Sequence, residues 1–156
     1  MVEAETFIQE VRAMERTLYR VARSYLPAWE ECADAVQEAL TKAWAKRGTV
    51  SEERFRPWLT RIVINECHNL GRRRKRMTLV EEVQPPLSPA PAPDLKDELS
   101  ALPEKLRMPL LLHYLEGFAL EDVAHTLRLP LGTVKSRLHQ GRKELRLQLE
   151  KEDGLK

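Results

Sequence analysis

The sequence predicts an all-α protein: two small helical domains joined by a proline-rich linker, with a helix-turn-helix in the second domain. Three observations support this fold class. Apolar residues recur at helical spacing in both halves of the chain, five prolines lie close together between the halves, and we find no strand candidate. We place the domains at residues 1–76 and 95–156 and the linker at residues 77–94.

The first domain is predicted to contain three helices. They run from about Glu5 to Tyr25, from Trp29 to Lys46, and from Glu52 or Arg56 to Arg74, with a loop at residues 47–51. Pro57 suits the first turn of the third helix. The side chains expected to face the core are Phe7, Val11, Met14, Leu18, Val21, Ala22, Tyr25, Ala33, Val36, Leu40, Ala43, Trp44, Phe55, Trp58, Leu59, Ile62, Val63, Cys67 and Leu70.

The segment after the third helix has the composition of an extended linker. Its prolines cannot donate backbone hydrogen bonds, so it favours neither a helix nor a sheet. The prolines are Pro85, Pro86, Pro89, Pro91 and Pro93. Beyond it we expect a short helix around residues 97–101 and a second helix over residues 103–115, which Pro109 should kink or interrupt.

Residues 118–149 carry the pattern of a helix-turn-helix, whose second helix enters the major groove of DNA. Leu120–Leu127 forms the first helix, with Leu120, Val123, Ala124 and Leu127 buried, and residues 128–130 form the turn. One stripe of the second helix is apolar: Leu131, Val134, Leu138, Gly141 and Leu145. The opposite side carries Lys135, Ser136, His139, Gln140 and Lys143, flanked by Arg137 and Arg142. Periodicity alone also allows an ordinary helical hairpin with a solvated basic face.

Charge is distributed unevenly although the net charge is only +2. Residues 54–76 carry eight basic side chains and one acidic side chain, including five consecutive basic residues at 72–76. Such a concentration indicates a nucleic-acid surface rather than a solvated charge run. No apolar run approaches the roughly 20 residues that span a membrane. Cys32 and Cys67 lack the spacing of a metal site and are expected in the core.

Three motifs together resemble the extracytoplasmic-function sigma factors of bacterial RNA polymerase. The first is Asp34-Ala35-Val36-Gln37-Glu38 followed by Lys42-Ala43-Trp44. The second runs from Phe55-Arg56-Pro57-Trp58-Leu59 through Asn65 to the basic cluster. The third is Leu102-Pro103, then Glu116-Gly117-Phe118, then Gly132 to Leu138. The resemblance covers nearly the whole chain and implies an alternative sigma factor that directs promoter recognition and DNA opening.

The resemblance assigns roles to three groups of residues. Docking on core polymerase falls to Asp34, Gln37, Glu38, Thr41 and Lys42. Recognition of the minus-ten element, including capture of a flipped base at the loop, falls to Arg47, Gly48, Thr49, Arg61, Asn65, Asn69, Arg72 and Arg73. Recognition of the minus-thirty-five element falls to Thr133, Lys135, Ser136, Arg137, His139, Gln140, Arg142 and Lys143.

The implied partners are core polymerase, through its beta and beta-prime subunits, promoter DNA and an anti-sigma factor. The linker would span the gap between the domains on polymerase. We expect no catalytic site, cofactor, metal or membrane insertion; the four histidines do not cluster and should lie at the surface or face DNA. The expected location is the cytoplasm, on the nucleoid when active or held at the membrane by an anti-sigma factor.

The chain departs from the family pattern at two places. Ala119 stands where a capping Ser or Thr is usual. Gln140 and Gly141 replace a more usual Arg-Ala pair, which puts a flexible glycine in mid-helix. Two other functions stay open at this point: a stand-alone helix-turn-helix regulator that binds a two-fold symmetric operator, and a sigma mimic that sequesters an anti-sigma factor. The intact basic cluster disfavours the mimic.

Overall fold

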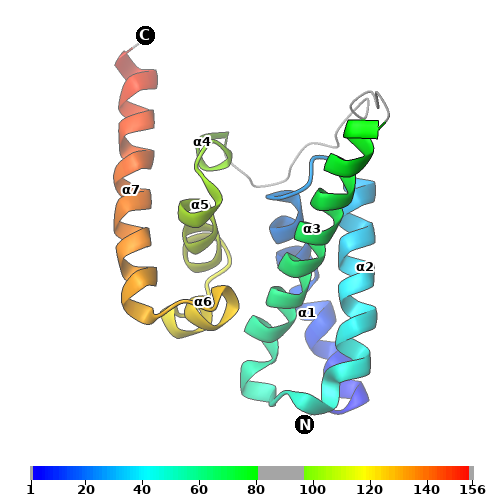
Figure 1. Ribbon diagram of the computed structural model, residues 1–156. Coiled ribbons are helices and arrows are strands. Elements are labelled where there is room, and N and C mark those ends of the chain that lie inside the picture. Colours follow the sequence, from blue (N-terminus) through cyan, green and yellow to red (C-terminus); the bar gives the residue numbers. More distant parts are fainter. Residues whose placement is uncertain (1, 81–96, 155–156) are drawn as a thin grey trace. The chain divides into compact units, whose positions relative to one another are not determined.

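The computed structural model describes residues 2–80 and 97–154 (Figure 1). Within these two ranges every regular element is helical and no strand occurs, so the all-α prediction is confirmed there. Contacts divide the chain into two compact units, Met1–Pro93 and Asp94–Lys156. Most of the segment predicted as a proline-rich linker, including all five of its prolines, lies outside the described residues.

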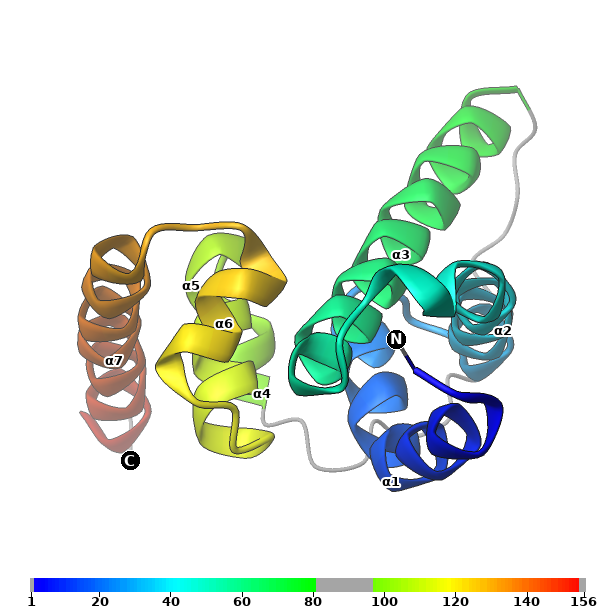
Figure 2. The same ribbon diagram turned by 90° about the horizontal axis from the view of Figure 1, so that it is seen from below.

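The first unit is a bundle of three helices, each of which contacts the other two (Figure 1 and Figure 2). They are α1 (Ala4–Arg23), α2 (Trp29–Lys46) and α3 (Phe55–Val80). α2 has the predicted bounds. α1 ends two residues before the predicted Tyr25, whose N–H still bonds to the carbonyl of Ala22 at 3.0 Å. The last turn therefore tightens before the chain reaches Pro27.

The core of the first unit depends on small side chains on α2. Cys32, Ala35, Ala39 and Ala43 are fully buried, which lets α1 and α3 approach α2 closely. Trp44 was predicted to face inward, and this is wrong: it is 40% exposed. Because α2 turns its small side chains towards the core, Trp44 lies at the edge of the buried face. The predicted core residues that are only half-buried are Val11, Tyr25, Ala33, Leu40, Trp58, Ile62 and Leu70.

Two short 3-10 turns lead into α3. They span Arg47–Thr49 and Glu52–Arg54, so the predicted loop is partly ordered and α3 begins at Phe55. Pro57 lies in the first turn, as predicted, where its missing N–H costs nothing. α3 runs past the predicted end at Arg74 to Val80. No proline stops it there, because the next proline after Pro57 is Pro85.

The second unit contains α4 (Asp97–Ser100), α5 (Glu104–Leu110), a π-helical segment (Leu111–Leu115), α6 (Leu120–Leu127) and α7 (Leu131–Gly154). The predicted interruption at Pro109 is present, since the α-helical pattern ends one residue later. The buried apolar side chains are Leu99, Leu102, Leu106, Met108, Leu110, Leu111, Leu112, Phe118, Val123, Val134 and Leu138.

α6 and α7 form the predicted helix-turn-helix. Arg128 ends α6 in the left-handed conformation with φ of 55°, and the carbonyl of Pro130 accepts the first bonds of α7. Leu120, Ala124 and Leu127 are half-buried rather than buried, because α6 turns Val123 and Thr126 inward. The Thr126 hydroxyl donates to the carbonyl of Asp122 at 2.8 Å, which satisfies its buried polar atom.

Candidate functional surfaces

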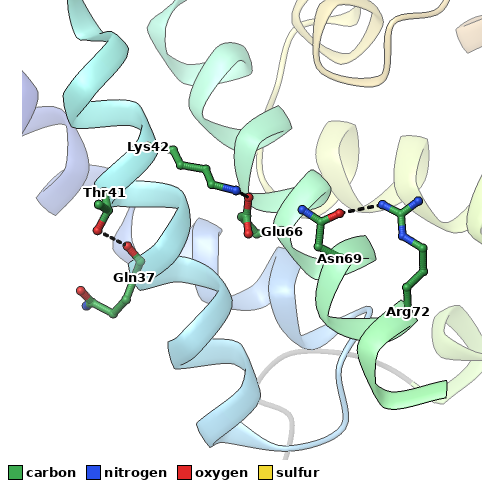
Figure 3. A network of polar contacts seen from close by, with 6 residues as sticks. All are labelled: Gln37, Thr41, Lys42, Glu66, Asn69 and Arg72. Atoms are coloured by element: carbon green, nitrogen blue, oxygen red, sulfur yellow. Dashed lines mark hydrogen bonds and ion pairs between the residues drawn. The ribbon is translucent and has the colours of Figure 1, made fainter. Parts of the chain in front are cut away.

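The polar face of α2 lies opposite its small buried face. Asp34, Gln37, Glu38 and Thr41 are all exposed, and the Thr41 hydroxyl donates to the carbonyl of Gln37 at 3.0 Å. Three of these side chains therefore leave their polar groups available to a partner. Lys42 differs, because its ammonium forms an ion pair with Glu66 of α3 (Figure 3).

α3 carries a polar face along most of its length. Arg61, Asn65 and Asn69 are partly exposed, and Arg72 and Arg73 are exposed. The Oδ1 atom of Asn69 accepts a hydrogen bond from Nη2 of Arg72 at 2.7 Å (Figure 3). These residue types suit phosphate and base contacts.

His68 is half-buried, like Asn65 and Asn69, and its ring packs edge-on against another aromatic ring. Its partner is Tyr25, with ring centroids 5.1 Å apart. His113 is likewise committed within the protein, with Nδ1 2.8 Å from the carbonyl oxygen of Phe118. Both histidines are half-buried and make contacts within the protein.

One of the five consecutive basic residues forms an ion pair with α2. Nε of Arg74 lies 3.1 Å from Oε2 of Glu31 on α2. The other four members of the cluster, Arg72, Arg73, Lys75 and Arg76, are exposed. The positive surface at this end of α3 therefore consists of these four residues, while Arg74 anchors the helix to α2.

The loop after α2 borders a shallow cavity of about 390 Å³. Its walls are Val2, Glu3, Ala4, Arg47 and Gly48. The N–H of Val2 donates to the carbonyl of Arg47 at 3.3 Å, which holds the N-terminal segment against the loop. The contribution of residues 2–4 was missed by sequence analysis, because this contact joins segments that are far apart in the chain.

Arg47 is held in place by the exposed Trp44. Its guanidinium carbon lies 3.7 Å from the centre of the Trp44 ring, and its Nη1 donates to the Trp44 carbonyl at 2.8 Å. The Thr49 hydroxyl donates to the carbonyl of Lys46 at 2.7 Å. Local contacts therefore hold the side chains of Arg47 and Thr49, and Arg47 with Gly48 also lines the cavity.

The polar face of α7 agrees with the predicted pattern of exposure. Lys135, Ser136, His139, Gln140, Arg142 and Lys143 are exposed, while Thr133 and Arg137 are half-buried. On the opposite side, Val134, Leu138 and Gly141 are buried. The Arg142 guanidinium donates to the hydroxyl of Tyr114, an exposed residue of the π-helical segment that sequence analysis missed.

Both cysteines are buried and free, as expected for core residues. Burial raises the pKa of the Cys32 thiol to about 11. Within residues 2–80 and 97–154, no group of three or more His, Cys, Asp or Glu side chains is arranged to hold a metal ion. In the same described ranges, no helix combines the length and apolar character needed to cross a bilayer.

Comparison with known proteins identifies both units. Residues 11–77 match the family model for sigma-70 region 2, and residues 94–145 match that for sigma-70 region 4. These two matches and the relatives of the chain together show that it belongs to the extracytoplasmic-function sigma factors. As such it is an alternative sigma factor that directs RNA polymerase to promoters, and it is an initiation factor rather than an enzyme.

Individual relatives agree with this family membership. The chain is 30% identical over 146 residues to the RNA polymerase sigma factor SigV of Bacillus subtilis, covering 89% of this chain and 88% of that protein. It is 28% identical to the ECF RNA polymerase sigma-E factor of Escherichia coli, covering 86% and 81%. It also superposes with a TM-score of 0.75 on the sigma factor RpoE of Bartonella quintana, solved with the anti-sigma factor NepR, at 28% identity over 94% of this chain and 98% of that chain.

Proposed function

We propose that the first unit of this sigma factor performs two tasks, one on each of two neighbouring helices. The exposed face of α2, formed by Asp34, Gln37, Glu38 and Thr41, docks on core polymerase. The polar face of α3, with the exposed basic residues at its end, holds the opened promoter strand and the adjoining duplex. Separate helices allow both contacts at once, and the positive charge at the end of α3 suits DNA phosphates.

The cavity beside Arg47 and Gly48 is the proposed receptor for a base flipped out of the minus-ten element. Removing a base from its stack costs a few kcal/mol, which a pocket must recover by contacts with the base. A volume of about 390 Å³ lies within the range of small-molecule sites. Gly48 carries no side chain, so the backbone of the loop is open to close approach by the base.

The second unit reads the minus-thirty-five element through the exposed face of α7. Lys135 and Ser136 lie near the start of this helix, where residues of a recognition helix reach base edges. Arg142 and Lys143 follow farther along and are suited to phosphates. The half-buried Arg137 and Thr133 lie at the border between the DNA face and the core, so their substitution should affect both binding and folding.

An anti-sigma factor is a further proposed partner. The support is the structural likeness to a sigma factor that was solved with such a factor bound. Because polymerase and the chromosome are the other proposed partners, the proposed place of action is the cytoplasm. Binding of an anti-sigma factor there would occlude the surfaces that polymerase and DNA need.

The observation that supports docking most directly is the exposure of Asp34 and Glu38 on the face of α2 that points away from the core. Replacing both by lysine should abolish retention of purified core polymerase on the immobilised protein. Glu15→Lys, an exposed change on α1, is the matched control and should retain polymerase. Equal retention by the double variant and the control would remove this face from the docking surface.

A further inference from the structure

The ion pair between Lys42 and Glu66 joins α2 and α3, the two helices of the first unit that carry the proposed binding faces. Its two partners lie 24 positions apart in the sequence, on α2 and α3. Glu66 is the only acidic residue among residues 54–76, and its side chain is 6% exposed, whereas that of Lys42 is 45% exposed. A nearly buried carboxylate is therefore held by a lysine that reaches inward from the docking helix.

Each partner of this pair adjoins one of the proposed binding faces. Lys42 follows Thr41, the last exposed member of the docking face. Glu66 follows Asn65 and lies less than one turn before Asn69, whose side chain accepts the hydrogen bond from Arg72 (Figure 3). Each residue of the ion pair is therefore next in sequence to a residue of one proposed binding face.

A gain in folding stability is a weak explanation for the presence of this ion pair. Burying a carboxylate carries a desolvation penalty that a single ion pair often only offsets, and apolar residues of similar size frequently serve as well. What an ion pair adds is a fixed register between the two elements that carry its charges. A second pair, between Glu31 and Arg74, joins the same helices nearer the far end of α3 at 3.1 Å.

We propose that Glu66 is a positioning residue for promoter opening and that Lys42 acts through Glu66 rather than as a polymerase contact. The pair fixes α3 against α2, so that the face carrying Asn65, Asn69 and Arg72 has one orientation relative to docked polymerase. This inference rests on the proposed docking and strand-holding roles of the two helices.

Two templates distinguish positioning from general damage to the fold. One is duplex promoter DNA, which the holoenzyme must open; the other carries a pre-opened minus-ten region. Glu66→Gln and Lys42→Met should each slow open-complex formation on the duplex roughly five- to tenfold, the scale of a lost coupling between contacting residues. On the pre-opened template the loss should be clearly smaller, because that DNA no longer has to be opened. Binding to core polymerase should be unchanged.

The double variant Lys42→Met with Glu66→Gln tests whether the two residues act as a unit. Its defect on the duplex should not exceed that of either single variant, because each single change already removes the interaction. Glu15→Gln is the matched neutralisation of an exposed carboxylate and should behave as wild type.

Equal losses on both templates, additive losses in the double variant, or weakened core binding by Lys42→Met alone would each overturn the proposal. So would wild-type opening rates in both single variants. Failure of the wild-type protein to bind core polymerase is a different outcome, because it would refute the proposed function itself.

Discussion

Leu110 of α5 lies directly against Gly141 of α7. A Cβ atom at position 141 would come within 2.9 Å of Cδ1 and 3.2 Å of Cγ of Leu110. The sequence suggested that Gly141 adds flexibility to the recognition helix. The structure adds a packing role, because the absence of a side chain at Gly141 lets α7 approach α5 closely.

Substitutions at Gly141 should therefore lower stability with the size of the new side chain. Alanine normally stabilises a helix interior by about 1 kcal/mol relative to glycine, and here the clash should cancel that gain. Leucine should cost about 1–3 kcal/mol through overpacking. Gly132→Ala is the control on the same helix, because nothing lies within 4 Å of its Cβ. Urea unfolding of the full chain measures the series; a gain from Gly141→Ala matching that from Gly132→Ala would contradict the contact.

α6 begins without a side-chain cap, as the sequence indicated. Ala119 has the extended backbone of an N-cap residue, with φ of −61° and ψ of 153°, but makes no capping hydrogen bond. Ala119→Ser should add about 1 kcal/mol, because the hydroxyl can accept from the N–H groups of Glu121 or Asp122. Amide hydrogen exchange across α6 checks this. Ala119→Val supplies no acceptor; protection equal to that of the serine variant would show that capping is not the cause.

Substitution of Lys135 should distinguish contact with a base from attraction to the DNA phosphates. If it contacts a base, Lys135→Ala should cost about 1–3 kcal/mol on the preferred minus-thirty-five sequence and relax the preference at one position. If it contacts a phosphate, the loss should be the same on every sequence and the salt dependence should weaken. Holoenzyme binding to a randomised element separates these results. Arg146→Ala, an exposed charge farther along α7, is the control; the same profile for both variants would remove Lys135 from the interface.

The thiol of Cys32 makes the free energy of unfolding depend on pH in the alkaline range. Its thiol is neutral when protonated, and burial raises its pKa in the folded chain from 9.0 to about 11. The folded state thus holds the proton more tightly than the unfolded state. The resulting stability is complete below about pH 9 and declines as the pH rises towards about 11.

Unfolding in urea across this pH range, compared with Cys32→Ala, measures the effect. The alanine variant should lose less stability between these pH values than the wild type does. Parallel curves for the two proteins would mean that Cys32 does not contribute to the alkaline decline.

Local periodicity was sufficient to predict most helices of the described residues. The bounds of α2 and α6 and the opposed faces of α7 follow from it, because they depend on residues three or four positions apart. The orientation of Trp44 was mispredicted. The face that α2 turns to the core is decided by close packing against α1 and α3, which requires small side chains. Periodicity favours large apolar residues and gives alanines little weight.

Contacts between distant segments could not be predicted in the same way. The ion pairs of Lys42 with Glu66 and of Arg74 with Glu31 each join residues far apart in sequence, and so does the hydrogen bond of Val2 to the loop beside the cavity. The family resemblance assigns Lys42 to a binding surface and the charge count assigns Arg74 to one, because neither reveals that an acidic partner lies on the neighbouring helix. The resemblance to a family predicts the binding faces, and the tertiary structure indicates which side chains on them are exposed.

Run-off transcription with purified core polymerase and a fragmented genomic library tests the central claim most directly. We predict that the protein binds core, directs new and specific start sites, and binds DNA poorly when polymerase is absent. The opposite pattern would contradict the account: no association with core, together with tight binding of the free protein to a palindromic site.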